Sequence, residues 1–132
     1  MRNRPCLTSA DTKTIMEACV AEAEKNKWNV AVAIVDDSGF LLRFQRMEGV
    51  APISAEVACG KARTSALTKR PSKFFEDRVK ERPAFANFPA GLLIQGGLPI
   101  LHQSECVGAI GVSGVQSHED EQIAQAGIAA LG

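Results

Sequence analysis

Glycine is concentrated near the end of this chain, and it restricts how that region can fold. Eight of the eleven glycines lie beyond residue 90. The apolar segment 106–112 carries Gly108 and Gly111, and Gly114 continues the spacing of three. Glycine inside an apolar strand offers no side chain to pack, which indicates that another backbone approaches closely. The segment therefore predicts a buried strand with a close neighbour, and the pair Gly96-Gly97 predicts a turn before it.

A short path leads from this strand into the final helix. Gly114 permits a turn, and Ser117-x-x-Asp120 resembles a capping box at the start of a helix over 119–131. The N-terminus of a helix carries backbone N–H groups without partners in the helix, which favour anions. We therefore expect a cavity beside the glycine strand that accepts an anionic or carbonyl-bearing ligand.

The remaining elements follow from hydrophobic periodicity and turn residues. Helices are predicted over 7–25, 53–69 and 72–80, and further strands over 30–36, 40–47, 92–95 and 98–102. Because most links between strands are short, we expect an α/β (α+β) fold with a five-stranded antiparallel sheet flanked by helices. The first and last helices should cover one face, with the glycine strand in the centre. The irregular segment 81–89 should either close over a pocket or dock on a neighbouring subunit.

Composition restricts the class of protein. The 132 residues suffice for one domain over 1–132, and the 15 basic and 15 acidic residues give no net charge. Neither nucleic acid nor membrane partners are expected, because no general positive charge and no bilayer-length apolar run is present. No Cys-x-x-Cys pair and no secretory signal occur, so we expect reduced thiols in a cytoplasmic protein.

His118 is the sharpest candidate for chemistry. It is expected in the first turn of the last helix beside Glu119, where it could act as an acid/base or ligate iron. The alternative is an exposed histidine with a surface role only. Arg46 and Lys61 could form a cationic clamp for a carboxylate, or they could pair with acidic residues of the chain. The remaining residues of the expected ligand site are Gly111, Ser113 and Glu119.

No catalytic motif or metal-ligand spacing is present, so no resident metal site is expected. His102 falls in a predicted strand, either as a polar edge residue or as an axial haem ligand. Met16 and Met47 could also ligate iron, but their spacing is more typical of a core.

Several motifs follow one another in a fixed order. They are Val35-Asp36-x-x-Gly39, Arg46-Met47-Glu48-Gly49, Ala58-x-x-Lys61-Ala62-x-Thr64, Gly96-Gly97-x-Pro99-Ile100, Gly108-Ala109-Ile110-Gly111-Val112-Ser113-Gly114 and Asp120-Glu121-x-x-Ala124-x-Ala126-Gly127. In this set and order the chain resembles the GlcG/HbpS family of haem-binding and glycolate-operon-associated proteins, which includes the C-terminal domain of PduO-type cobalamin adenosyltransferases. The resemblance implies a profilin-like sandwich, homo-oligomers, and haem bound near subunit surfaces in some members.

The chain departs from the pattern of that family at three places. Glu48 stands where the family usually has Asp, Gln103-Ser104 replaces an Asp-Gly turn, and His118 occupies a position that the family does not fix. The resemblance places no haem ligand on a particular residue.

Three functions remain as hypotheses. The first is a small-ligand-binding protein that holds haem or a related tetrapyrrole. The alternative is an enzyme that acts on a small organic acid by proton transfer, as an isomerase, tautomerase or lyase, with the Arg46/Lys61 clamp and His118 as acid/base. The third is a structural subunit that assists another enzyme.

Overall fold

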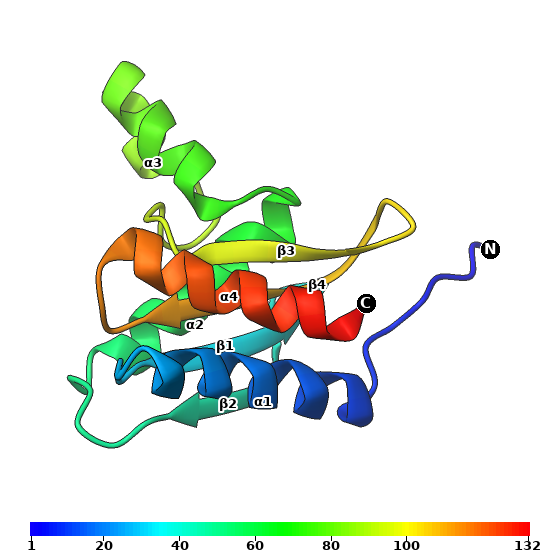
Figure 1. Ribbon diagram of the computed structural model, residues 1–132. Coiled ribbons are helices and arrows are strands. Elements are labelled where there is room, and N and C mark those ends of the chain that lie inside the picture. Colours follow the sequence, from blue (N-terminus) through cyan, green and yellow to red (C-terminus); the bar gives the residue numbers. More distant parts are fainter.

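A four-stranded antiparallel sheet lies between helices in the computed structural model, which describes residues 1–132 (Figure 1). The strand order is β2-β1-β4-β3, with bounds β1 (Ala31–Asp36), β2 (Leu41–Arg46), β3 (Gly97–His102) and β4 (Glu105–Ser113). The helices are α1 (Ser9–Lys25), α2 (Ser54–Thr68), α3 (Ser72–Glu81), the 3₁₀ helix η1 (Pro83–Asn87) and α4 (Ser117–Leu131). The mixed α/β class is confirmed, and the glycine-rich strand β4 is central, as predicted.

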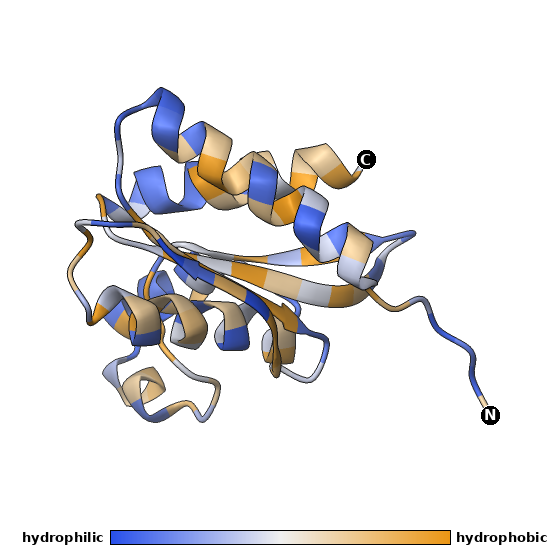
Figure 2. Ribbon diagram, turned by 90° about the horizontal axis from the view of Figure 1, so that it is seen from below, coloured by the Kyte–Doolittle hydropathy of each residue, from blue (hydrophilic) through white to orange (hydrophobic).

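Strand β1 shows how the sheet separates two cores. Its residues alternate between the faces, and both faces are buried. One core joins Val32 and Ile34 to apolar side chains of α1 and α4, and the other joins Ala31 and Ala33 to alanines of α2. Figure 2 shows helical layers on both faces of the sheet, with hydrophobic segments turned toward it. Helices α1 and α4 thus cover one face together, as the sequence predicts.

Helix α2 lies unusually close to the sheet because small residues meet along the contact. Ala58 and Ala62 are fully buried against β1 and β4. A Cβ atom added to Gly111 would lie 2.0 Å from the carbonyl oxygen of Ala58 and 2.5 Å from the backbone nitrogen of Ala62. The glycine in the centre of β4 therefore accommodates the backbone of α2, which is the close approach that the sequence predicts.

The predicted fifth strand over 92–95 is wrong, because helix side chains bind its backbone. Thr64 Oγ1 donates to the carbonyl of Leu92 at 2.6 Å, and Ser72 Oγ donates to that of Ile94 at 2.6 Å. The N–H of Gln95 donates to Glu76 Oε1 at 3.3 Å. These bonds satisfy polar groups that would otherwise need a neighbouring strand, so the segment forms an irregular loop with bends at residues 94 and 95 and does not join the sheet.

Two helices begin at other residues than the sequence suggests. In α1, Thr8 is the N-cap and forms a capping box with Asp11. In α4, Gln116 and Glu119 form the box, whereas the sequence suggests Ser117 and Asp120. Asp120 is instead buried, with 2% of its surface exposed, and forms an ion pair with Lys61 of α2.

Substituting Gly111 with Ala should destabilise the fold by about 3 kcal/mol, since the added methyl group meets helix backbone that cannot move alone. Gly60→Ala is the matched control, because its added Cβ meets only the side chain of the loop residue Leu92. Alanine is also the better helix former there, by about 1 kcal/mol. Urea unfolding measures both variants. Equal stability of the two variants would contradict the close backbone contact.

Candidate functional site

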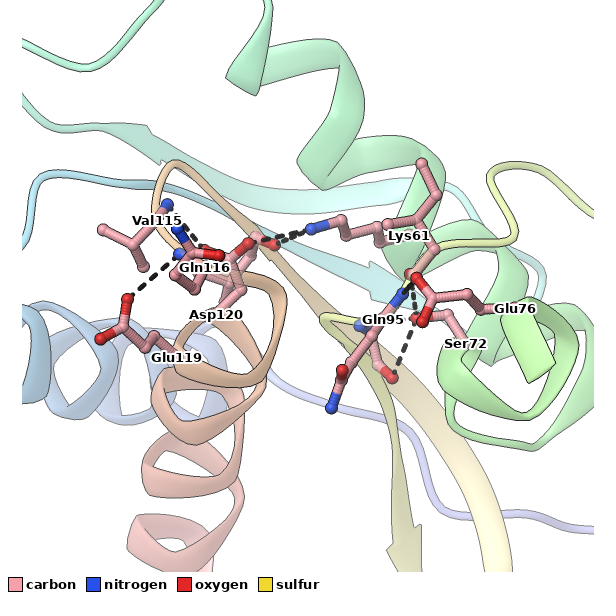
Figure 3. A network of polar contacts seen from close by, with 11 residues as sticks. Lys61, Ser72, Glu76, Gln95, Val115, Gln116, Glu119 and Asp120 are labelled. Atoms are coloured by element: carbon pink, nitrogen blue, oxygen red, sulfur yellow. Dashed lines mark hydrogen bonds and ion pairs between the residues drawn. The ribbon is translucent and has the colours of Figure 1, made fainter.

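A buried ion pair joins the helices on opposite faces of the sheet (Figure 3). Lys61 Nζ of α2 donates to Asp120 Oδ2 of α4 at 3.0 Å and to the carbonyl of Val112 in β4 at 2.9 Å. The lysine and aspartate side chains are only 3% and 2% exposed. The pair therefore ties three elements together inside the protein.

Glycines at the start of β3 make room for the lysine. A Cβ atom on Gly96 would lie 2.7 Å from Lys61 Nζ, and one on Gly97 would lie 2.4 Å from the carbonyl oxygen of Lys61. Gly96 also has a φ of +133°, which side chains disfavour. Gly96 thus leaves room for the side chain of Lys61 to reach Asp120, and Gly97 leaves room for the backbone of α2 at Lys61.

Asp120 is held by more than the lysine. Its Oδ1 atom accepts the N–H of Val115 at 3.1 Å, in the turn before α4. Burial raises the pKa of the Asp120 carboxyl, and the ammonium of Lys61 opposes this rise. A buried charge without a partner is strongly unfavourable, so each member of the pair needs the other.

The expected ligand site beside the glycine strand is not a cavity. Lys61 has its ammonium engaged with Asp120, and Gly111 packs on the backbone of α2. Arg46 and Ser113 both pair with Ala31 and so lie in one row across the sheet, with Arg46 exposed and Ser113 buried. The structure thus brings Arg46 and Ser113 to one end of the sheet. It leaves no open space at Gly111, because the backbone of α2 lies there.

His118 and Glu119 lie at the same end of the molecule, in the first turn of α4. His118 is exposed, and Glu119 Oε1 accepts the N–H of Gln116 at 3.1 Å. No hydrogen bond joins His118 to any other side chain. The ligand-binding and catalytic roles expected for these residues stay predictions.

A groove lies at the opposite end of β3, where the strand leads to the hairpin turn. Its volume is about 280 Å³, and its wall combines ionisable with apolar side chains. The ionisable ones are Cys6, Asp11 and His102, and the apolar ones include Leu7, Ile100, Leu101, Val107, Ile128 and Leu131. The groove therefore gathers two side chains that can ligate haem iron within an apolar surface.

The N-terminal arm brings Cys6 to this groove because neighbouring residues fix the arm. Leu7 packs against the core of α1 and α4, and its Cδ1 atom occupies the space that a Cβ on Gly108 would need. Arg4 forms an ion pair with Asp37, and Arg2 lies 3.8 Å from Glu105. Cys6 and His102 are far apart in the sequence, so no motif spacing could have paired them. The one signal in the sequence is the apolar Leu7 directly after Cys6, which indicates that the arm packs against the core.

Asp11 contributes the acidic group of the groove. Its carboxylate accepts the N–H of Thr8 at 2.8 Å, which lowers the pKa of Asp11, and the neighbouring His102 adds to this effect. The capping box of α1 therefore also places a carboxylate near the imidazole of His102.

The structure offers neither a membrane-spanning helix nor a metal-binding cluster. No helix combines the length and apolar character needed to cross a membrane. No cluster of three or more His, Cys, Asp or Glu residues is arranged to hold a metal ion.

Comparison with known proteins points to one family. Residues 7–129 match the model of the family described as "Haem degrading protein HbpS-like". Protein GlcG of Escherichia coli is 39% identical over 114 residues, which cover 86% of this chain and 85% of GlcG.

Two solved structures share the fold. A double mutant of HbpS from Streptomyces reticuli has a TM-score of 0.92 and 34% identity, covering 100% of this chain and 91% of that one. The structure of a complex of PduOC with haem has a TM-score of 0.88 and 27% identity, covering 96% and 95% of the two chains.

Replacing Lys61 with Met should cost about 3–5 kcal/mol of stability near neutral pH, because it leaves Asp120 buried without its partner. Burial then raises the pKa of Asp120 further because the ammonium of Lys61 no longer opposes it, so the folded state holds a proton that the unfolded chain releases. Stability of this variant should therefore fall as the pH rises through that pKa, and the loss relative to wild type should be smaller at pH 5 than at pH 8.

Urea unfolding at both pH values measures this dependence. The matched control is Lys73→Met, which removes an ion pair with Asp77 whose side chains are 44% and 47% exposed and should cost only about 0–1 kcal/mol. The double variant Lys61→Met/Asp120→Leu should recover much of the lost stability. A loss for Lys61→Met that is the same at both pH values would contradict the proposed electrostatic cause.

Proposed function

The chain belongs to the HbpS-like family of haem-degrading proteins, and from this membership we propose that it binds haem or a related tetrapyrrole in the groove beside His102. The observation that carries the proposal is that Cys6 and His102 line one apolar groove. A relative of the same fold in complex with haem supports it.

The residues of the groove fit the chemical character of haem. The macrocycle is planar and largely apolar, and its iron takes a histidine nitrogen or a cysteine thiolate as an axial ligand. His102 is exposed at the end of β3 and supplies an imidazole. The apolar side chains of β3 and α4 supply contact area for the ring. When bound, haem would bring the redox and ligand-binding chemistry of its iron.

His102 is the preferred axial ligand, because Asp11 lies near it. Asp11 and His102 line the same groove, and the negative charge of a nearby carboxylate makes a metal-ligating imidazole a stronger donor. Cys6 lies in the same groove on the N-terminal arm, and its thiol is exposed. It is the second candidate for a bond to iron.

The size of the groove favours a homo-oligomer. Its volume of about 280 Å³ lies just below the range of small-molecule pockets, about 300–1,000 Å³. Haem held there would keep part of its ring outside the groove. Leu101 at its margin is 56% exposed, so a second copy of the chain that packs here would cover both the ring and this leucine.

The alternative function, proton transfer on a small organic acid, gains no specific support from the geometry. Its clamp requires a free Lys61, whereas this ammonium is bound to Asp120 and to the carbonyl of Val112. We therefore retain haem binding as the proposed function.

Titration of the protein with haemin should shift and sharpen the Soret band relative to free haemin, because a histidine ligand changes the electronic structure of the iron. The variant His102→Ala should bind at least roughly tenfold more weakly, a loss of about 1.4 kcal/mol. It should also lose the wild-type spectrum, since its axial ligand is gone.

His118→Ala is the matched control, because His118 is the other histidine of the chain and is exposed far from the groove. It should leave both the spectrum and the affinity unchanged. A wild-type spectrum identical to that of free haemin would rule out haem binding. Loss of the spectrum in His118→Ala but not in His102→Ala would place the iron at α4.

A further inference from the structure

Four of the six phenylalanines pack together on the arm formed by α3 and η1, which extends away from the sheet (Figure 1). Phe75 stacks on Phe88 with ring centroids 5.1 Å apart, and Phe85 stacks on Phe88 at 5.6 Å. Phe74 meets Phe75 edge to face at 5.1 Å. Phe75 is buried, while Phe88 is 39% exposed. The arm therefore presents an aromatic surface to the outside.

Arginine side chains lie over these rings. The guanidinium carbon of Arg70 is 4.4 Å from the centroid of Phe74, and that of Arg82 is 5.3 Å from the centroid of Phe85. Arg78 lies near both rings and also reaches Glu81 at 3.7 Å. In contrast, Arg70 and Arg82 form no ion pair with any carboxylate of the chain.

A hollow of about 430 Å³ opens beside the stacked rings. Its wall includes Leu67, Arg70, Phe74, Phe75, Phe88 and Pro89, and no acidic side chain lines it. Leu67 is 42% exposed at its margin. The hollow thus combines aromatic and aliphatic walls with one guanidinium that has no anionic partner.

These features define the chemistry of a ligand. A guanidinium that stacks on an aromatic ring keeps its N–H groups free in its plane, where they match the two oxygens of a carboxylate. The face of Phe74 is covered by arginine side chains, so the apolar wall open to a ligand is formed by Leu67, the exposed part of Phe88 and Pro89. We propose that the hollow binds a small aromatic carboxylic acid, with its carboxylate on Arg70 and its ring against Leu67, Phe88 and Pro89.

This proposal does not rest on haem binding. The wall of the hollow contains no His, Cys or Met side chain, so it offers iron no axial ligand. The two sites also have no lining residue in common. Either can fail without the other.

The test is a titration followed by two-dimensional NMR of the backbone amides, with benzoate as the probe. Benzoate should shift the amide signals of residues 67–75 and 88–90. Acetate, which has the charge without the ring, and benzyl alcohol, which has the ring without the charge, should each bind at least roughly tenfold more weakly. This comparison separates a combined site from a general anion or apolar contact.

Variants of exposed residues complete the test without endangering the fold. Arg70→Gln should weaken benzoate binding at least roughly tenfold, and Arg70→Lys should also weaken it, because lysine keeps the charge but lacks the planar fork. The matched control Lys80→Gln removes an exposed charge of the same arm outside the hollow and should leave binding unchanged.

Three results would overturn the proposal: no shift with benzoate, equal binding of acetate and benzoate, or wild-type affinity in Arg70→Gln. Sedimentation of the wild-type protein and of Phe88→Ser tests whether a second copy occupies the surface instead. Self-association that Phe88→Ser abolishes, together with no binding of benzoate, would assign the hollow to an interface between copies of the chain.

Discussion

The ion pair between Lys61 and Asp120 is the contact on which the architecture depends. It is the point where α2 on one face of the sheet is joined to α4 on the other, and it also binds the carbonyl of Val112 in the central strand. Such a pair contributes little net stability compared with apolar packing, but losing one member leaves a charge in the interior. The pair therefore requires glycine at position 96, because a side chain there would occupy the space of the Lys61 side chain, while Gly97 makes room for the backbone of α2 at the Lys61 carbonyl.

This constraint also decides where a ligand cannot bind. The carboxyl end of β4 is filled by the lysine, by the backbone of α2 and by the turn into α4. Hollowed surfaces instead occur where the packing is looser. One is the far end of β3, beside the N-terminal arm, and another is the arm of α3 and η1 outside the sheet. The surfaces proposed to bind ligands thus lie away from Gly111 and Gly114 of the glycine motif.

Local patterns predicted much of this fold, and the errors have a common cause. The alternation of side chains in β1 and the glycine spacing in β4 predicted these two strands correctly, and the glycine spacing also predicted that β4 is central in the sheet. Both patterns are formed by residues that are close together in the chain. The fifth strand failed because Thr64 and Ser72 bind the backbone of the segment 92–95 from distant helices. The glycines were compatible with a ligand or with a helix, and the structure distinguishes the two because the backbone of α2 lies against Gly111 and Lys61 is bound to Asp120. His102 was recognised as a possible iron ligand, but its neighbours in the groove come from the two ends of the chain.

The distribution of possible iron ligands explains why the groove is preferred for haem. Met16 is 5% exposed within the core, and Met47 is half-buried and packs against the same core, so both side chains serve apolar packing. His118 is exposed, but its neighbours at the start of α4 are the polar Ser117 and Glu119, which offer no apolar contact to a ring. At His102 the imidazole, a thiol and an apolar wall occur together. The aromatic arm offers aromatic and guanidinium groups without a metal ligand, so we propose different ligands for the two surfaces, an iron tetrapyrrole in the groove and a metal-free aromatic acid on the arm.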